Sequence, residues 1–447
     1  MTLVDADPFA ELRDLDVRTD AAALAAVLTD RSSTHAGEAI AVVRARSTGD
    51  VQALLAWADR TGTPVIARGG GSALTGASAS ARGAVVLDLS GLDRILEIRP
   101  VDGVVRVEPG VVLADLDAAA ALHGLRYAPD PGSVRLATVG GSIATNAGGL
   151  HGAKYGVTRD AVLALDVVLA DGRLIHVGRD TLKGVAGYDL VGLFTGSEGT
   201  LGVVVGATLR LLPAPAATAT ATAAFASADA AAEAVARIAT TGARPAVLEL
   251  LDAATLGAID ALDGTRLADG VGALLLVQTD GHGAEAELAA VIEALRTTAV
   301  RIEIAADAGE ADRLIAVRRS ALPAVEQHGP VLIEDVVVPI SRLADAIRGI
   351  ERIAAETGVP IFVFAHAGDG NLHPIVLALD RIRAERAAER IFALALDLGG
   401  TITGEHGVGS LKREWLAREV GPEVLALQQG IKALLDPRGI LNPGRAL

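Results

Sequence analysis

The sequence predicts an α+β protein of two domains, and three observations support this prediction. The chain has 447 residues, which exceeds one ordinary domain. Its first half sets short strands between three glycine-rich clusters, whereas its second half alternates helix and strand, a pattern typical of an antiparallel sheet covered by helices. An Ala/Thr/Pro-rich connector, residues 214–222, lies between the halves, and we interpret it as the domain boundary.

The first half begins with segments of clear periodicity. Residues 8–28 are expected to form one or two short helices, with Asp20 as an N-cap before A-A-A-L-A-A-V-L. A short strand is expected at residues 39–44. A helix capped by Thr48-Gly49-Asp50 follows, with apolar residues at helical spacing, and Gly62 should close it.

The first glycine cluster is G-G-G-S-A-L-T-G at residues 69–76, directly after a strand that begins at Pro64. Glycines let backbone N–H groups approach a pyrophosphate without interference from Cβ atoms. Another strand, residues 83–90, follows too soon for the crossover helix of a Rossmann unit. The pattern therefore predicts a strand-loop-strand phosphate cradle of another kind.

A longer glycine-punctuated segment, residues 127–156, follows a strand at 104–108 and a helix at 113–122. It contains P-D-P-G-S (129–133) and T-V-G-G-S-I-A-T-N-A-G-G (138–149). So much irregular chain inside a compact domain costs conformational entropy. We interpret it as backbone wrapped round a cofactor.

The remaining elements follow in order along the chain. A hairpin over Asp171-Gly172 joins strands 162–169 and 173–177, and a third glycine cluster, 196–204, feeds a strand that ends at Pro213. The expected elements of the second half are helices 228–240 and 284–295, strands 246–251 and 273–278, and a last helix at 422–434 before the tail D-P-R-G-I-L-N-P-G-R.

Two histidines, His366 and His373, flank the strongest turn signal of the chain, Asp369-Gly370. If these two residues form a type I′ turn, the histidines lie directly opposite each other on one face, with Cβ atoms about 5 Å apart. Such a pair needs only one carboxylate to complete an open metal site. The glycine-rich loop T-G-E-H-G-V-G at residues 403–409 offers that carboxylate in Glu405.

Charge and composition exclude several classes of function. A net charge of −15 without a clustered basic footprint argues against nucleic acid as a partner. An anionic substrate then needs a site made locally positive by a metal or by particular arginines. Because the chain has no cysteine, it has no disulfide, Cys-ligated iron–sulfur cluster, catalytic thiol or cysteine-linked flavin.

Location is predicted from the apolar pattern. Residues 1–11 carry three acidic side chains and no apolar core, so no secretory signal is expected there. No uncharged apolar run reaches the roughly 18 residues of a membrane span. We expect a cytoplasmic protein, peripheral at the membrane only through a partner.

Together these motifs resemble the FAD-linked oxidases of the vanillyl-alcohol oxidase and p-cresol methylhydroxylase (PCMH) superfamily, over nearly the whole chain from about Ala39. Within it they are most similar to the branch of D-lactate dehydrogenases, glycolate oxidase catalytic subunits and D-2-hydroxyglutarate dehydrogenases. The resemblance implies an N-terminal helical segment (1–35), a two-part PCMH-type FAD-binding domain (36–215), an antiparallel-sheet cap domain for substrate and metal (216–415), and a C-terminal segment (416–447) that returns to the flavin.

The resemblance also implies roles for individual residues. His366, His373 and Glu405 match the metal ligands, His406 the catalytic base, and Arg318 an arginine that binds the substrate carboxylate, although Arg319 is the alternative. The implied FAD-binding residues are Arg68, Gly69, Gly70, Gly71, Ser72, Thr75, Gly76, Pro131, Gly132, Ser133, Gly140, Gly141, Ser142, Ala144, Thr145, Asn146, Gly148, Gly149, Gly199, Thr200, Leu201, Gly202, Val203 and Asn442.

Three departures from the family pattern refine these expectations. Ser72 stands where related flavoproteins link the flavin through histidine, so the FAD should be non-covalent. Ile315 replaces a tryptophan ahead of the strand 334–340. Ile333 replaces the lysine of the hydroxyglutarate enzymes, and the absence of this lysine weakens the case for a substrate with two carboxylates.

The implied reaction is the FAD-dependent oxidation of a small D-2-hydroxy acid, such as D-lactate or glycolate, assisted by Zn or Mn. The electron acceptor is left open among a quinone, a cytochrome, an electron-transfer flavoprotein and an iron–sulfur partner subunit, and a homodimer is an open expectation. The alternatives are a metal-independent alditol or sugar oxidase of the same fold and a flavin-bearing electron-transfer subunit without a substrate.

Overall fold

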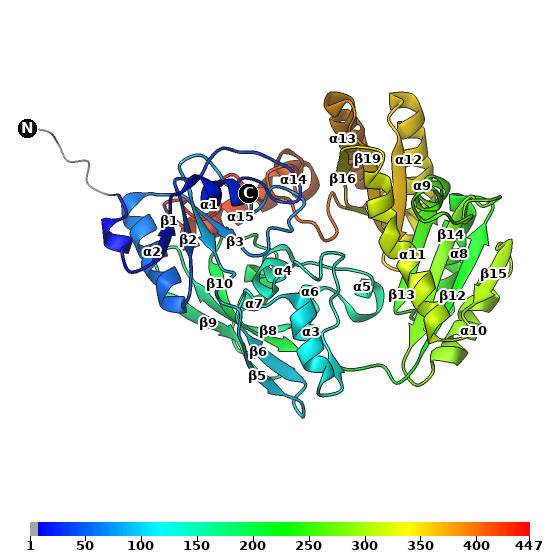
Figure 1. Ribbon diagram of the computed structural model, residues 1–447, viewed down its shortest axis with the longest axis horizontal. Coiled ribbons are helices and arrows are strands. Elements are labelled where there is room, and N and C mark those ends of the chain that lie inside the picture. The colour runs from blue at the N-terminus through cyan, green and yellow to red at the C-terminus, as the bar shows by residue number, and fades with distance from the viewer. Residues whose placement is uncertain (1–7) are drawn as a thin grey trace, which may run out of the picture. The chain divides into compact units, whose positions relative to one another are not determined.

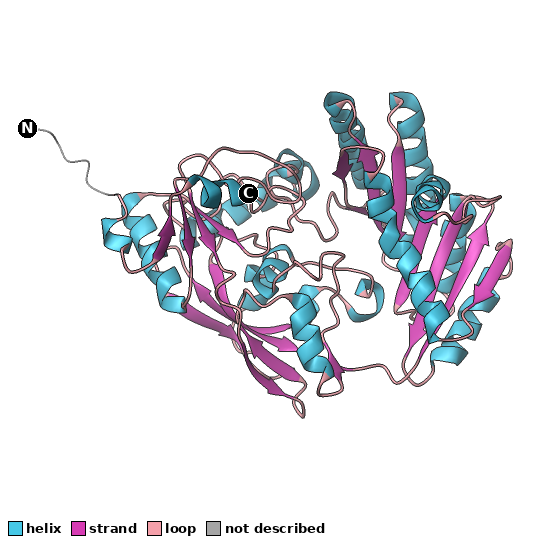
Figure 2. Cartoon of the chain, in the orientation of Figure 1, coloured by secondary structure: helices cyan, strands magenta, loops and turns pink. Residues whose placement is uncertain are grey.

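The computed structural model describes residues 8–447 and confirms the predicted α+β class (Figures 1 and 2). The chain folds as two compact units. The first contains the described residues up to Ala147 together with Val157–Ala214 and Glu405–Leu447, and the second contains Gly148–Gly156 and Pro215–Gly404. Each unit has its own sheets and its own core.

The first unit begins with η1 (Ala10–Leu12), β1 (Asp16–Arg18) and α1 (Ala21–Ala26). Asp20 is the N-cap of α1, as predicted, and accepts the Ala23 N–H. The expectation of helix alone over residues 8–28 was wrong at β1. This segment pairs antiparallel with β2 (Ala41–Arg44), a tertiary contact that local periodicity does not report.

The predicted helix after β2 is α2 (Thr48–Thr61). Its N-cap is Ser47, whose side chain accepts the Asp50 N–H, one residue before the predicted cap. It ends at Gly62, as predicted, and this residue has a φ of 70°, in the left-handed region that glycine favours.

The predicted strand-loop-strand cradle is present as β3 (Val65–Arg68), β4 (Val85–Asp88) and a connection without helix. The two strands are parallel neighbours in a four-stranded sheet of order β1-β2-β4-β3. Because that connection contains no crossover helix, the cradle is not a Rossmann unit.

A second, five-stranded sheet has the order β5-β6-β10-β8-β9 and is antiparallel throughout. The expected hairpin over Asp171-Gly172 is confirmed as β8 and β9, whereas β5 was not anticipated. The elements of this part are β5 (Ile95–Arg99), β6 (Val104–Val107), α3 (Leu113–Ala121), β7 (Leu125–Arg126), α4 (Val139–Thr145), α6 (Thr158–Ala161), β8 (Val162–Val168), β9 (Leu174–Gly178), α7 (Leu190–Phe194), β10 (Val203–Arg210) and β11 (Leu212–Pro213).

Part of the glycine-punctuated segment is helical, whereas the sequence predicted irregular chain. Residues 139–145 form α4, whose N-cap Thr138 accepts the Gly141 N–H through its side chain. The helix ends at Asn146, which has a φ of 53°. Thr138 and Asn146 therefore allow one short helix inside a sequence that glycine content alone predicts to be loop.

The second unit is built on an eight-stranded antiparallel sheet of order β15-β12-β14-β13-β18-β19-β16, with β17 also paired to β19. The strands are β12 (Thr218–Phe225), β13 (Val247–Asp252), β14 (Ala273–Asp280), β15 (Arg301–Ile304), β16 (Val331–Ile333), β17 (Val336–Val337), β18 (Ile361–His366) and β19 (Asn371–Leu377). Part of the predicted connector is β12, because alternating Thr and Ala over 218–222 suit a pleated strand.

Helices cover this sheet (Figure 1). The core on one face joins α9 and α11 to β13, β18 and β19 through Leu256, Val325, Leu251, Phe364 and Ile375. Helix α8 packs against α10 and α12, and α12 packs against α13. The bounds are α8 (Ala228–Ile238), α9 (Ala253–Asp263), α10 (Ala284–Leu295), α11 (Ala308–Glu326), η2 (Ile340–Arg342), α12 (Leu343–Thr357) and α13 (Arg381–Asp397), with α5 (Gly152–Tyr155) from the earlier segment.

After Gly404 the chain contributes to the first unit. Helices α14 (Arg413–Val420) and α15 (Pro422–Leu435) follow, and α15 matches the predicted last helix. The tail then places Leu441 beside Val65 as an isolated parallel bridge. The C-terminal segment thus pairs with the strand that leads into the glycine cradle.

Candidate metal and flavin sites

His366 and His373 lie on the same face of the β18–β19 hairpin, but the predicted pairing was wrong. His366 pairs with Asn371 and His373 with Phe364, so the histidines are diagonal neighbours. Their ring centroids are 4.9 Å apart and the ring planes are nearly perpendicular, at 86°. The histidines still share a face, because Phe364 and His366 are two residues apart on β18 and Asn371 and His373 are two residues apart on β19. Residues two apart in a strand point to the same side of the sheet.

A four-residue connection, in place of the predicted two-residue turn, explains the change in register. The N–H groups of Ala367 and Gly368 both donate to the Leu248 carbonyl of the neighbouring strand β13. Gly370 has a φ of 83°, and a Cβ placed there would lie 2.1 Å from the Val338 carbonyl oxygen. The third strand and the 338 backbone therefore shape the turn.

A buried carboxylate, Glu249 on β13, joins His366 to Arg318. Its Oε1 lies 2.7 Å from His366 Nδ1, and its Oε2 accepts a 2.6 Å hydrogen bond from Arg318 Nε. Glu249 is fully buried. Arg318, on α11, also lies over the ring of Phe364 at 4.3 Å.

The electrostatics of this cluster follow from its burial. Desolvation acts to raise the pKa of Glu249, but the neighbouring His366 and Arg318 outweigh it and hold that pKa below its ordinary value. Arg318 is buried, whereas Arg319 is exposed. Of the two arginines considered from the sequence, only Arg318 therefore lies in the cluster with the histidines.

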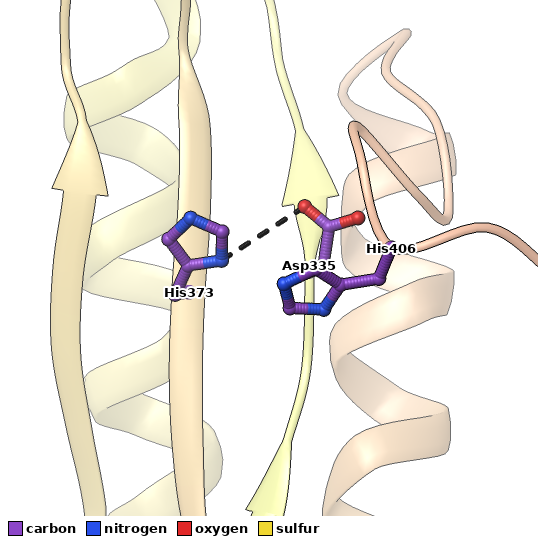
Figure 3. Close-up of side chains that lie close together, drawn as sticks. All are labelled: Asp335, His373 and His406. Atoms are coloured by element: carbon purple, nitrogen blue, oxygen red, sulfur yellow. Dashed lines mark ion pairs between the residues drawn. The ribbon is translucent and has the colours of Figure 1, made fainter. Parts of the chain in front are cut away.

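A second buried carboxylate, Asp335, lies beside His373 (Figure 3). Its Oδ1 lies 3.9 Å from His373 Nδ1, and its Oδ2 accepts 2.7 Å hydrogen bonds from the Thr403 hydroxyl and the Gly404 N–H. Asp335 is fully buried and lies in the two-residue link between β16 and β17. It thereby holds the last two residues before Glu405.

The donor set suits a divalent cation. One group of potential ligands is His366, His373 and Glu405, and a second is Asp335, His373 and His406. In each group the ligand atoms lie within 4.8 Å of one another. Two imidazoles and a carboxylate are the donor types of catalytic zinc sites.

In the first unit, the glycines of the cradle allow it to pack closely against residues 136–138. A Cβ at Gly69 would lie 2.3 Å from the Thr138 hydroxyl, and one at Gly70 would lie 2.0 Å from the Leu136 carbonyl oxygen. The cradle thus lies directly against the start of the segment that contains α4. Glycine-rich backbone of this kind can present its N–H groups to the phosphates of a dinucleotide.

Arg68 stabilises the cradle itself. Its Nη1 donates to the carbonyl of Ser78, further along the loop, at 2.9 Å, and to that of Thr29, after α1, at 3.0 Å. Burial lowers the pKa of the Arg68 guanidinium. The two hydrogen bonds from Arg68 therefore hold the loop in its conformation.

Asn442 connects the tail to two glycine-rich segments. Its Oδ1 accepts the Ala67 N–H at 3.0 Å, and its Nδ2 donates to the Glu198 carbonyl at 2.6 Å. The Glu198 carboxylate in turn accepts the N–H groups of Val408 and Gly409 at 2.7 and 2.8 Å. The predicted cofactor segments around β3, residue 199 and the tail thus come together in one unit.

Other predicted cofactor residues make mainly local contacts in the structure. The Thr145 hydroxyl donates to the Gly141 carbonyl and the Thr200 hydroxyl to the Ser197 carbonyl. Residues 131–133 form a turn in which Val134 N–H donates to the Pro131 carbonyl.

Sequence reasoning did not identify Glu249, Asp335 or Glu198. A signal was present for the first two, because Glu249 interrupts the apolar run V-L-E-L-L and Asp335 precedes V-V-V-P. A charged residue inside a buried strand requires a partner, which makes it a candidate for a site. Nothing in the sequence indicated which partners these were.

Comparison with known proteins agrees with this architecture. A family described as FAD binding domain matches residues 39–178, and a family described as FAD linked oxidases, C-terminal domain matches residues 214–446. Among solved structures, p-cresol methylhydroxylase with substrate bound superposes with a TM-score of 0.81 at 18% identity, covering 98% of this chain and 96% of that one. At that identity the likeness concerns the fold.

Relatives of higher identity span nearly the whole chain. The glycolate oxidase subunit GlcD of Bacillus subtilis (strain 168) is 41% identical over 414 residues, covering 91% of this chain and 88% of the relative. A D-lactate dehydrogenase of Anaerostipes hadrus is 34% identical over 432 residues (90% and 88%), and one of Archaeoglobus fulgidus is 36% identical over 415 residues (92% and 92%).

The chain therefore belongs to the FAD-linked oxidases and contains an FAD-binding domain, which confirms the resemblance seen in the sequence. Within that family it is an FAD-linked oxidoreductase of the glycolate oxidase subunit GlcD and D-lactate dehydrogenase type. Among the described residues, no helix has both the length and the apolar character that crossing a membrane requires.

Proposed function

We propose that the protein oxidises a small D-2-hydroxy acid, of the D-lactate or glycolate type, to the 2-oxo acid, with FAD as oxidant and a divalent metal, Zn or Mn, in the site. The names of its relatives support the substrate class. The arrangement of Arg318, His366 and His373 on one buried face supports the use of both a cation and a carboxylate-binding group.

The main observation behind this proposal is the hydrogen bonding of Arg318. Within residues 8–447 its hydrogen bonding to protein is the bond from Nε to Glu249, so its two terminal NH₂ groups remain available to a substrate carboxylate. A guanidinium presents two parallel N–H donors to a carboxylate, which gives both energy and orientation. In a protein of net charge −15, such a local positive group is what an anionic substrate requires.

The other residues have complementary roles. His366, His373 and Glu405 would hold the metal, and His406 would take the proton of the substrate hydroxyl. Bound FAD would supply the acceptor for a hydride from Cα, and a bound metal would lower the pKa of the hydroxyl. The Cα hydrogen leaves with two electrons as hydride, and the hydroxyl hydrogen leaves as a proton. The product is the 2-oxo acid.

On this proposal residues 36–215 and 416–447 hold the FAD, and residues 216–415 supply the metal and substrate groups. The FAD would be non-covalent, because Ser72 occupies the position of a flavin-linking histidine and the chain has no cysteine. Acid denaturation should therefore release the flavin into the supernatant, and flavin that stays with the precipitated chain would contradict this.

The test is anaerobic mixing of the FAD-loaded protein with D-lactate, L-lactate, glycolate, D-2-hydroxyglutarate and an alditol, with flavin absorbance as the readout. We expect bleaching by D-lactate or glycolate in metal-loaded protein and little in chelator-treated protein. Bleaching by the alditol after chelation would favour a sugar oxidase. Failure of every hydroxy acid with metal present would favour an electron-transfer subunit and overturn the proposal.

A further inference from the structure

Glu249 is a charged residue placed where an apolar one would be expected. It lies in the middle of β13, between Leu248 and Leu250, in a strand that is buried on both sides. Removing a carboxylate from water is costly unless close partners compensate. Each oxygen of Glu249 has a separate partner at short distance, His366 for Oε1 and Arg318 for Oε2.

The contact with His366 determines which nitrogen of the imidazole carries its proton. An ionised carboxylate only accepts hydrogen bonds, so His366 Nδ1, 2.7 Å from Oε1, must be the protonated nitrogen. In a neutral imidazole the other nitrogen, Nε2, then keeps its lone pair. A carboxylate behind a ligating histidine sets the tautomer and the ring orientation in this way.

The contact with Arg318 determines which edge of the guanidinium is free. Glu249 engages Nε, and Phe364 lies against the flat face at 4.3 Å. Rotation of the group is therefore restricted by a carboxylate at one edge and a ring at its face. The terminal nitrogens remain as the pair that a second carboxylate can contact.

On the basis of the function proposed above, we propose that Glu249 is a positioning residue with two simultaneous tasks: it orients His366 as a metal ligand and Arg318 as the receptor for the substrate carboxylate. One side chain thus links the metal and substrate halves of the site. The partners are 117 and 69 residues away in the sequence, so the sheet and α11 create this link.

The test is Glu249→Gln in the full-length, FAD-loaded protein, with two readouts. An amide of the same shape loses the charge and can accept at only one of its two ends, so at least one contact is lost. We expect the affinity for Zn²⁺ or Mn²⁺, measured by competition with a chromogenic chelator, to fall about 10–100-fold, as is usual when the carboxylate behind a ligating histidine is lost. We also expect the KM for the hydroxy acid to rise by roughly the same factor, in metal-saturated protein.

Two further variants separate the tasks. Arg318→Lys should raise KM without changing the metal affinity. Asp252→Asn alters another carboxylate of β13, at its end, which accepts the N–H groups of Thr255 and Val363 and contacts neither His366 nor Arg318. It should leave both the metal affinity and KM at wild-type values, which controls for the loss of a hydrogen-bonded carboxylate from this strand.

A second measurement does not depend on the folding of a variant. In metal-free wild-type protein labelled with ¹⁵N-histidine, the signal that is absent from His366→Asn should show a protonated Nδ1 and an unprotonated Nε2. The opposite tautomer would overturn the proposal.

The remaining outcomes are distinguishable. If Glu249→Gln folds and keeps wild-type metal affinity or wild-type KM, the joint role of Glu249 is wrong while the proposed function stands. If wild-type protein binds no divalent metal yet oxidises hydroxy acids, the metal part of the proposed function fails, and with it the role of Glu249 toward His366.

Discussion

The carboxylate of Asp335 accepts a 2.7 Å hydrogen bond from the backbone N–H of Gly404, the residue directly before Glu405 and His406. The same oxygen, Oδ2, accepts the Thr403 hydroxyl at 2.7 Å, while Oδ1 lies 3.9 Å from His373 Nδ1. One buried side chain thus contacts a histidine of the hairpin and the backbone that leads to the other two site residues.

Asp335→Asn should therefore disturb the site without disturbing the flavin. The amide lacks the negative charge that both donors and His373 face, and hydrogen bonds to charged groups contribute about 1.5–3 kcal/mol. We expect metal affinity and the rate of flavin reduction to fall about 10–100-fold at unchanged FAD content. Thr403→Val removes one of the donors and should have a smaller effect. Wild-type rates in Asp335→Asn would show that this contact does not organise the site.

Removal of the metal should abolish turnover and leave the flavin spectrum intact. The histidine pair lies in the second unit, whereas the FAD cradle lies in the first. A strong chelator should inactivate the protein reversibly, with activity restored by Zn²⁺ or Mn²⁺, and His366→Ala should be inactive at normal FAD content because a ligand is missing. Metal content by elemental analysis and absorbance spectra provide the check. Full turnover in metal-free protein would contradict the proposed site.

His406→Ala tests the proposed base. Loss of a general base typically costs roughly 10² to 10⁴-fold in rate. The variant should bind FAD and metal normally, change KM only modestly, and reduce its flavin at least about a hundredfold more slowly in anaerobic stopped-flow experiments. If it reduces flavin at the wild-type rate, the proton is taken by another group.

Gly70→Ala should impair FAD binding. The added Cβ would lie 2.0 Å from the carbonyl oxygen of Leu136 and 3.0 Å from its carbonyl carbon, so backbone must move apart where the two glycine-rich segments meet. We expect a lower ratio of flavin to protein after purification and a lower melting temperature. Gly49→Ala is a matched control, because a Cβ there meets only the Ser47 hydroxyl at 3.5 Å. Equal flavin content in both variants would contradict the prediction.

Glu198 should make stability depend on pH. Burial, the largest influence, raises its pKa from an ordinary 4.5 to about 7 despite the N–H groups of Val408 and Gly409. Because the folded-state pKa is raised, the stabilisation from the protonated group is complete below about pH 4.5 and is lost as the pH rises through 7.

Glu198→Gln removes this titration, so the free energy of unfolding of wild type minus that of the variant should be larger at pH 5 than at pH 8. The change is at most roughly 3 kcal/mol, at about 1.4 kcal/mol per pKa unit. Urea unfolding at the two pH values measures it, and an equal difference at both would refute the prediction. Glu97→Gln, the same substitution at an exposed position, is the control for the loss of a glutamate charge.

The sequence determined the local features of this protein. The glycine clusters, the strand-loop-strand cradle without a crossover helix, and the shared face of His366 and His373 all follow from short-range patterns, because strand periodicity and glycine geometry are properties of neighbouring residues.

Tertiary structure alone decided the rest. The hairpin has the register His366 opposite Asn371 because a third strand binds the turn through Leu248. Glu249 meets His366 and Arg318 because β13 pairs with β18 and α11 packs on their face. A buried charge indicates that a partner exists, but its identity depends on which distant segments the sheet brings together, and this information is absent from any local window of the sequence.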